Sequence, residues 1–272
     1  MPDIKSYKKV LTIAGSDSGG GAGIQADLKA FSANGVYGMS AITAITAQNT
    51  ERVRAIHPVP VDFIEKQIAT VMEDIGADTV KIGMLHSTEV IKTVIASLKK
   101  YQINNIVVDP IMVATSGDKL LQDNAIDILI KELLPLASVI TPNIPEAEII
   151  LNKKIHNWSE FTEAARKLSQ TGAKSVLLKS GHFKAEKLID IFYVSEGDEL
   201  IEIPYKRIDT KNTHGTGCTL SSAIAAWLAH GFSLKEAIQK GLKYTHQTIA
   251  EGSKYQLGKG HGPVHHFYKF WN

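Results

Sequence analysis

The amino-acid sequence predicts an α/β fold in which a mostly parallel sheet carries helices on both faces. Short β-branched, apolar runs alternate with longer segments of helical spacing from one end of the 272 residues to the other. Consecutive apolar positions within these runs are typical of strands buried on both faces, as in a parallel sheet. No linker, internal repeat or low-complexity tract interrupts the alternation, so we expect a single domain spanning residues 1–272.

The expected elements follow one another along the first two thirds of the chain. Buried strands are expected at Val10–Ala14, Thr79–Ile82, Asn105–Val108, Ser138–Thr141 and Ser175–Lys179. Helical spacing is found at Ala22–Asn34, Phe63–Ile75, Glu89–Tyr101, Asn124–Leu133 and Glu160–Gln170. Gly35, Gly76 and Gly172 closely follow three of these helices, where glycine commonly ends a helix.

The last third of the chain departs from strict alternation. Leu188–Val194 and Leu200–Pro204 are joined through a short turn at residues 196–198, a pattern typical of an antiparallel hairpin. Two further helices are expected at Thr216–His230 and Leu234–Ala250. Ligands of open α/β sheets bind beyond the carboxyl ends of the strands, so the segments that directly follow the strands are the candidates for a site.

Composition excludes several classes of protein. With 44% hydrophobic and 21% charged residues, the chain has enough apolar surface to bury a core. A formal charge of +2 argues against binding to a nucleic-acid backbone. No apolar run is long enough for a transmembrane helix, and the polar residues 1–9 do not match a secretory signal. The lone Cys218 excludes an intrachain disulfide, so we expect a cytoplasmic protein.

The first predicted strand leads into a glycine-rich stretch at residues 15–23. Such glycines let the backbone approach a ligand closely and expose amides at the start of the next helix. A flexible turn is the plain alternative. Gly21, Gly23 and Ala26 also satisfy a dinucleotide-binding pattern, but the glycines begin too far after the predicted strand and the expected ribose-binding acid is missing.

A second glycine-containing stretch, residues 212–222, opens the apolar helix expected from Thr216. Gly215, Thr216 and Gly217 would present several backbone N–H groups to one point, which stabilises negative charge on a transferring phosphoryl group. Cys218 lies in the first turn of this helix, where the pKa of a thiol is expected to be lowered. A buried structural cysteine is the usual alternative for a lone Cys.

Charged and polar residues follow three other strands. Asp109 ends one strand, Asn143 and Glu146 follow the next, and Lys179 ends a third. Two acids in such positions suit a Mg²⁺ ion that bridges nucleotide phosphates, and Lys179 would bring positive charge to a phosphate. Taken alone, a glutamate in the position of Glu146 is more often an acid at a helix N-terminus. The histidines of the C-terminal tail have no metal-ligand spacing, so we interpret them as a structural or surface tail.

Taken together, the motifs resemble those of bacterial hydroxymethylpyrimidine/phosphomethylpyrimidine kinases of thiamin biosynthesis, members of the ribokinase-like superfamily. The resemblance runs almost from end to end and is carried by AGSDSGGGAGIQADLK, TAQNT, KIGML, DPIMVATSGD, TPNIPEAE, KSGH and NTHGTGCTLS. It implies a three-layer αβα sandwich and a homodimer. It also implies ATP-dependent phosphorylation of 4-amino-5-hydroxymethyl-2-methylpyrimidine, first to the monophosphate and then to the diphosphate.

The resemblance also implies the roles of individual residues. The pyrimidine pocket would be formed by Gly15, Asp27, Gln48, Met84, Ile111 and Cys218. Within it, Asp27 and Gln48 would bind the aminopyrimidine edge, and Met84 and Ile111 would pack on the ring faces. The anion hole would run from Gly215 to Cys218. The nucleotide would be surrounded by Asn143, Glu146, Lys179 and Thr213, with Mg²⁺ near Asp109 and Glu146.

Cys218 stands where many relatives in the superfamily carry an aspartate that takes the proton of the alcohol. A thiolate would serve as that base, or the loose transition state would need little base strength.

Three alternatives in function remain open at this point. A pyridoxine/pyridoxal kinase is built on a similar scaffold, but Gln48 and the Lys81–Met84 stretch favour the pyrimidine. A nucleotide-linked oxidoreductase lacks its ribose-binding acid. A non-catalytic sensor of a thiamin precursor would be expected to have lost Gly215 and Gly217, which are present.

Overall fold

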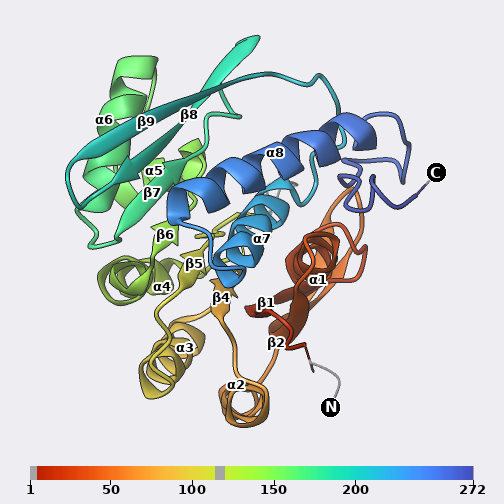
Figure 1. Ribbon diagram of the computed structural model, residues 1–272, viewed down its shortest axis with the longest axis vertical. Coiled ribbons are helices and arrows are strands. Elements are labelled where there is room, and N and C mark those ends of the chain that lie inside the picture. Colours follow the sequence, from red (N-terminus) through yellow and green to blue (C-terminus); the bar gives the residue numbers. More distant parts are fainter. Residues whose placement is uncertain (1–4, 114–119, 272) are drawn as a thin grey trace.

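A central sheet organises the computed structural model, which describes residues 5–113 and 120–271 (Figure 1). Within these residues nine strands are ordered β3-β2-β1-β4-β5-β6-β7-β8-β9. Six neighbouring strands, from β2 to β7, run parallel, and β3, β8 and β9 are antiparallel to their neighbours. The strands are β1 (Lys9–Asp17), β2 (Tyr37–Gln48), β3 (Val53–Pro58), β4 (Thr79–Ile82), β5 (Ile106–Val108), β6 (Val139–Ile140), β7 (Ser175–Leu178), β8 (Lys187–Val194) and β9 (Glu199–Lys206).

Helices cover both faces of this sheet, which makes the fold the expected three-layer αβα sandwich (Figure 1). One face carries α1 (Gly23–Ala33), α7 (Thr216–Ala229) and α8 (Leu234–Gly252). The other carries α2 (Val61–Asp74), α3 (Thr88–Lys100), α4 (Asp123–Ile128), α5 (Ile144–Leu151) and α6 (Trp158–Ser169). After α4 the chain continues through a π-helical turn, Leu129–Leu133, and a 3₁₀ turn, Leu134–Leu136.

The strand side chains alternate between two hydrophobic cores, as the pleat of a sheet requires. In β5, Ile106 and Val108 belong to the core beneath α2 to α6, and Val107 belongs to the core beneath α1, α7 and α8. Leu11 and Val10 of β1 divide between the same two cores. The prediction of strands buried on both faces is therefore confirmed.

Most of the expected elements are found within one or two residues of their predicted ends. The hairpin pairs β8 with β9 in antiparallel register, from Lys187 opposite Lys206 to Val194 opposite Glu199. Gly35, Gly76 and Gly172 have φ values of 77°, 71° and 92°, so each adopts the left-handed conformation that glycine allows after a helix.

The first strand corrects one argument made from the sequence. β1 continues to Asp17, three residues beyond its predicted end, so the glycines at 19–21 follow the strand almost directly. The spacing argument against a dinucleotide loop therefore fails. The strand is longer because Ser16 and Asp17 pair with Ile45 and Thr46 across a bulge in register, which local apolarity does not reveal.

Two strands and one helix lie outside the set expected from the sequence. β2 is rich in Ser, Thr and Ala, and Ile45 on it is 50% exposed, so its sequence lacks the dense apolar run of a central strand. β3 is an antiparallel edge strand and is mostly exposed. The short α5 follows Asn143. No helix in the described part of the chain is long and apolar enough to cross a membrane.

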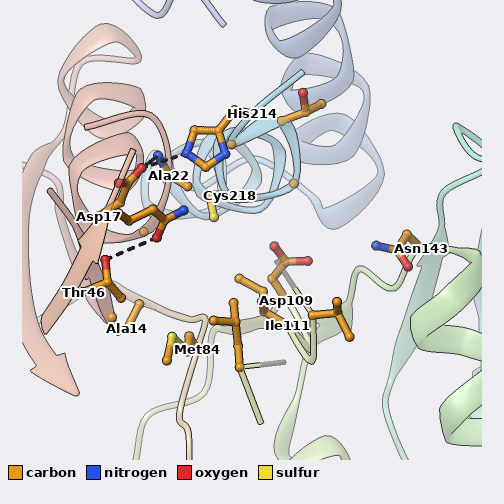
Figure 2. Close-up of a pocket in the computed structure, with 18 of the residues that line it drawn as sticks. Ala14, Asp17, Ala22, Thr46, Met84, Asp109, Ile111, Asn143, His214 and Cys218 are labelled. Carbon is orange, nitrogen blue, oxygen red and sulfur yellow. Dashed lines mark hydrogen bonds and ion pairs between the residues drawn. The ribbon is translucent and has the colours of Figure 1, made fainter. Parts of the chain in front are cut away.

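The fold brings the chemistry-bearing segments together. Because β1, β4, β5, β6 and β7 are parallel, their carboxyl ends lie along one edge of the sheet. Asp17, Met84, Asp109, Asn143 and Lys179 lie at or just beyond these ends. The start of α7 lies at the same edge, as Figure 2 shows for Cys218 and Asp109. Residues 114–118 of the DPIMVATSGD stretch lie outside the described residues.

Candidate active site

A cavity of about 790 Å³, its open mouth included, lies at the carboxyl ends of the central strands (Figure 2). Its walls come from the segment after β1, the end of β2, the segments after β4 to β7, and the start of α7. The predicted site residues that line it are Gly15, Gln48, Met84, Asp109, Ile111, Asn143, Glu146, Lys179, Thr213, Gly215, Thr216, Gly217 and Cys218. The topology thus places all but one of the predicted residues around one space.

Asp27 is the exception, and its predicted position in the pocket is wrong. Its side chain is fully buried, and its two oxygens lie 3.0 Å from the Lys81 ammonium nitrogen. The hydroxyl groups of Thr12 and Ser222 donate to the same carboxylate at 2.6 and 2.7 Å. With its acceptor positions used inside the protein, Asp27 is a structural carboxylate below the cavity floor.

Lys81, the partner of Asp27, is a residue that sequence reasoning missed. Its side chain is completely buried on β4, and burial alone would lower the pKa of its ammonium. The charges of Asp27, Cys218 and Asp109 outweigh burial and raise that pKa above its ordinary value. A lysine inside the apolar strand Thr79–Ile82 is the sequence signal for such a site, since a buried lysine needs an acidic partner.

The glycine-rich turn after β1 is organised by Asp17. Its carboxylate accepts hydrogen bonds from the N–H groups of Gly19, Gly21 and Ala22 at 2.8 to 3.0 Å. The Nε2 atom of His214 donates to the same carboxylate at 2.8 Å (Figure 2). Burial acts to raise the pKa of Asp17, but the hydrogen bonds from His214, Ala22 and Gly19 outweigh it and lower that pKa.

Asp17 and His214 therefore join the two glycine segments that the sequence presented separately. Their positions 197 residues apart explain why sequence reasoning assigned them no role. The available signal is an aspartate directly before a run of glycines, a position in which its carboxylate commonly binds the following amides.

Gly215 makes this close contact possible. It adopts a left-handed conformation with φ of 78°, and a Cβ atom there would lie 1.8 Å from the carbonyl oxygen of Gly21. Only glycine both adopts this conformation without strain and lacks the Cβ atom that would collide. The turn after β1 and the start of α7 are thus in direct backbone contact.

The first turn of α7 lines the cavity at the position where the sequence predicts an anion hole. The initial N–H groups of a helix have no acceptor within the helix. In this turn the N–H of Thr216 is bonded to the carbonyl of Thr213. Among the described residues the N–H groups of Gly217 and Cys218 have no backbone acceptor, and both residues line the cavity. A Cβ atom on Gly217 would lie 3.3 Å from Asp109 Oδ2 and 3.4 Å from Lys179 Nζ. The absence of a side chain therefore keeps open the space between the amides and Lys179.

The expectation of a lowered pKa at Cys218 is wrong. Burial raises the pKa of the thiol to about 12, and the charges of Asp27 and Asp109 act in the same direction. Lys81 and the N–H of Gly23 oppose this shift without overcoming it. The helix N-terminus is too weak to compensate for the loss of solvation. At neutral pH the side chain that points into the cavity is the thiol (Figure 2).

Lys179 lies beside Gly217 and pairs with the carboxylate of Asp109. Its ammonium donates to Asp109 Oδ1 at 3.0 Å, and Thr141 donates to the same oxygen at 2.9 Å. Burial acts to lower the pKa of Lys179, but Asp109 and Glu146 outweigh burial and raise it, so the side chain stays charged. This cation is available to a phosphate in the cavity.

Glu146 is the acid at the start of α5, and it also lines the cavity. It forms a capping box with Asn143, in which the N–H of Asn143 donates to Glu146 Oε2 and Asn143 Oδ1 accepts from the N–H of Glu146. Burial raises the pKa of its carboxyl group to about 7, helped by Asp109 and opposed by Lys179 and the N–H of Asn143. The carboxyl group caps α5 and also lines the cavity.

The two predicted metal ligands fit a hydrated Mg²⁺ ion. Among the described residues no three His, Cys, Asp or Glu side chains gather as a metal cluster. Asp109 and Glu146 nevertheless both line the cavity, and burial, with the nearby charge of Asp109, raises the pKa of Glu146. Mg²⁺ is commonly bound by one or two protein carboxylates and takes its remaining ligands from water and phosphate.

The remaining wall is suited to a flat ring. Gly15 lies against Met84, since a Cβ atom on Gly15 would lie 3.0 Å from the methionine sulfur. Ile111 lines the cavity nearby (Figure 2). Gln48 supplies the polar edge: its Oε1 lies 3.2 Å from the Thr46 hydroxyl, which also donates to the Ser16 carbonyl at 2.7 Å. Ser18 bonds to both backbone groups of Gln48. An amide held in this way selects a ring with matching donors and acceptors.

Comparison with known proteins agrees with this geometry. The profile of the family described as Phosphomethylpyrimidine kinase matches residues 17–265. The hydroxymethylpyrimidine/phosphomethylpyrimidine kinase of Rhizobium meliloti (strain 1021) is 49% identical over 262 residues, which cover 96% of this chain and 97% of the relative.

Solved structures show the same fold. The phosphomethylpyrimidine kinase of Clostridium difficile 630 is 48% identical with a TM-score of 0.78, over 89% of this chain and 99% of that structure. The pyridoxal kinase of Bacillus subtilis, solved as an ADP complex, is 39% identical with a TM-score of 0.89, over 98% of this chain and 100% of that structure.

Proposed function

The chain belongs to the phosphomethylpyrimidine kinase family, and from this premise we propose how its cavity performs the reaction. It is a kinase of thiamin biosynthesis that phosphorylates hydroxymethylpyrimidine and then the resulting monophosphate. The observation that carries the proposal is the start of α7, where Gly217 and Cys218 line the cavity and the Lys179 ammonium lies close to Gly217. Such an arrangement stabilises charge on a transferring phosphoryl group.

We propose that ATP is the donor and that it lies along Asn143, Glu146, Lys179 and Thr213. These residues line one side of the cavity, and the related pyridoxal kinase of Bacillus subtilis was solved with ADP. Lys179 would neutralise the phosphate oxygens. Asp109 and Glu146 would hold Mg²⁺, which when bound would stabilise negative charge on the phosphates.

In the first step, the hydroxymethyl oxygen forms a bond to the γ-phosphorus of ATP. The bond from that phosphorus to the bridging oxygen of ADP breaks, and the hydroxyl proton is released. In the second step, the oxygen that attacks belongs to the phosphate of the monophosphate, so no hydroxyl proton has to be removed. One cavity serves both acceptors because its contribution is positioning and charge stabilisation.

This two-step chemistry accounts for the protonated Cys218. A base strong enough for an alcohol would have no use in the second step, and a loose transition state requires little base strength in the first. We propose that Cys218 contributes its backbone N–H and a thiol contact to the acceptor. Because its pKa is raised, the thiol fits the role of a substrate contact better than the role of a general base.

The pyrimidine would lie between Met84 and Ile111, with its amino edge toward Gln48. The test is a product assay with ATP, Mg²⁺ and either hydroxymethylpyrimidine or pyridoxine, followed by mass spectrometry. The diphosphate should appear from the pyrimidine. Gln48→Met should lower kcat/KM for the pyrimidine relative to pyridoxine by about 10-fold or more, because the amide that would hydrogen-bond to the ring is lost.

Two outcomes would contradict these assignments. Phosphate found only on pyridoxine would move the enzyme to vitamin B6 salvage. An unchanged substrate ratio in Gln48→Met would remove Gln48 from the specificity wall. Activity on both rings would show that the scaffold shared with pyridoxal kinases also retains the second activity.

We also propose that the enzyme is a cytoplasmic homodimer. A reducing compartment suits a free thiol at the wall of a catalytic cavity. The exposed apolar side chains of Ile45 on β2 and of Val61 and Phe63 on α2 are candidates for the dimer contact. Light scattering during size-exclusion chromatography would give the mass, and a monomeric mass would exclude the dimer.

A further inference from the structure

We propose that the C-terminal strap, residues 258–266, is a positioning element that holds the two sides of the cavity at a fixed separation. The inference rests on the proposed roles of Gln48 and of the anion hole. The strap bonds to the turn that follows Gln48 at one point and to the segment that leads into Gly215 at another. Gly260 and Gly262 are the positioning residues at these two contacts.

The first contact fixes the turn between β2 and β3. The N–H of His261 donates to the carbonyl oxygen of Thr50 at 2.9 Å, and the N–H of Gly260 donates to Thr50 Oγ1 at 3.2 Å. A Cβ atom on Gly260 would lie 2.1 Å from that carbonyl oxygen. Since Thr50 lies two residues after Gln48, a displacement of this turn would move the wall that binds the ring.

The second contact fixes the approach to the anion hole. The N–H of His214 donates to the carbonyl oxygen of Gly262 at 3.0 Å, and His214 forms a parallel bridge with Pro263. A Cβ atom on Gly262 would lie 2.1 Å from Asn212 Oδ1. His214 directly precedes Gly215, so this contact positions the amides that receive the phosphoryl group.

The strap is firmly anchored to the helices beneath it. Val264 and His266 are 4% and 5% exposed. The ring of His266 lies 2.9 Å from Thr219 Oγ1 on α7, and its carbonyl accepts from the Tyr244 hydroxyl on α8. A rigid strap with one contact on each side of the cavity couples the ring-binding wall to the anion hole.

The two glycines permit a specific test. Neither Gly260 nor Gly262 has a positive φ, so alanine is compatible with the backbone and only the neighbouring atoms oppose its methyl group. The methyl group of each Gly→Ala substitution is thus expected to displace the segment that forms one side of the cavity. A merely structural role would lower stability and affect both sides alike.

The experiment measures kcat and KM for hydroxymethylpyrimidine at saturating ATP, together with the thermal midpoint. Gly260→Ala should raise KM for the pyrimidine about 10-fold and leave kcat within about threefold, because it displaces the turn after Gln48. Gly262→Ala should lower kcat about 10-fold with KM within about threefold, because it displaces the anion hole. The control is Gln256→Ala, an exposed position in the same tail, which should change neither constant.

Two milder variants keep the test valid if Gly260→Ala or Gly262→Ala prevents folding. Thr50→Ala removes the acceptor of the Gly260 N–H and should raise KM. Asn212→Ala removes the side chain that lies against Gly262 and should lower kcat. Equal changes in kcat and KM on both sides, or a loss of stability alone, would overturn the positioning role.

Gln48→Ala separates this inference from the proposed function. If Gln48→Ala leaves the pyrimidine KM unchanged, the assignment of the ring-binding wall fails. If Gln48→Ala raises KM and Gly260→Ala does not, the wall is correctly assigned and the strap proposal fails.

Discussion

At the scale of single residues, the cavity depends on backbone groups as much as on side chains. Gly215 is required because a methyl group would collide with the carbonyl of Gly21, and Gly217 because it would fill the space beside Asp109 and Lys179. The Lys179 ammonium pairs with Asp109, and His214 holds the Asp17 carboxylate by a hydrogen bond. The site is therefore preorganised before any ligand arrives.

Substitution of Gly217 tests the anion hole. Gly217→Ala should lower kcat about 100-fold and leave the dissociation constant of the pyrimidine nearly unchanged, because its methyl group occupies the space beside the amides, which act mainly on the transition state. Single-turnover kinetics and calorimetric binding of the pyrimidine would measure the two effects. Weakened binding with preserved turnover would show that the amides hold the ground state instead.

Substitution of Cys218 tests the protonation of its thiol. Because burial raises the pKa of this thiol to about 12, Cys218→Ser should keep kcat within about 10-fold and leave the pH profile of kcat between pH 6 and 9 unchanged. The measurement is kcat against pH for both proteins. A loss of about 1,000-fold with a displaced profile would establish the thiolate as the base.

At the scale of secondary-structure elements, the site is built from strand ends, turns and helix starts that are tied together below the cavity. The Asp27 carboxylate bonds to Thr12 on β1, Lys81 on β4 and Ser222 on α7, and Asp27 itself lies on α1. Four elements thus meet at one buried ion pair. Ser222 is one helical turn after Cys218, so the network also fixes the start of α7.

Removing one member of this pair should be costly. Lys81→Met leaves the Asp27 carboxylate buried without its cation and should lower the free energy of unfolding by about 3–5 kcal/mol. Chemical denaturation gives this value. The double variant Asp27→Asn with Lys81→Met, which buries no charge at the pair, should recover most of the loss. A double variant no more stable than Lys81→Met would contradict the ion-pair explanation.

At the scale of the whole molecule, the C-terminal tail completes a site whose first residues lie at the N-terminus. His214 bonds to Asp17 from 197 positions away, and His266 packs behind the same helix start. Burial lowers the pKa of His266 to about 3, with Lys29 and His265 acting in the same direction, so its imidazole stays neutral in the folded protein.

This buried imidazole predicts a pH dependence of stability. Between about pH 6.5 and 3 the unfolded chain binds a proton at His266 and the folded chain does not, so stability should fall as the pH falls through this range. His266→Gln should make the slope of unfolding free energy against pH shallower by up to about 1.4 kcal/mol per pH unit. The raised pKa values of Glu146 and Asp190 act in the opposite direction in both proteins, so the difference reports on His266.

Denaturation at several pH values provides this comparison. His261→Gln, at an exposed position of the same tail, is the control and should keep the original slope. An identical slope in His266→Gln and the unsubstituted protein would show that His266 is not the group responsible.

The sequence by itself determined the α/β class, most strand and helix positions, the two glycine segments and the family resemblance. These features follow from hydrophobic periodicity and short motifs, which are properties of residues close together in the sequence. The tertiary structure decided that Asp27 faces Lys81 below the cavity, that the Cys218 thiol is protonated, and that Asp17 binds His214. The solvation and the partners of each polar group are set by burial and by contacts between residues far apart in the sequence. A local sequence pattern gives no information about either.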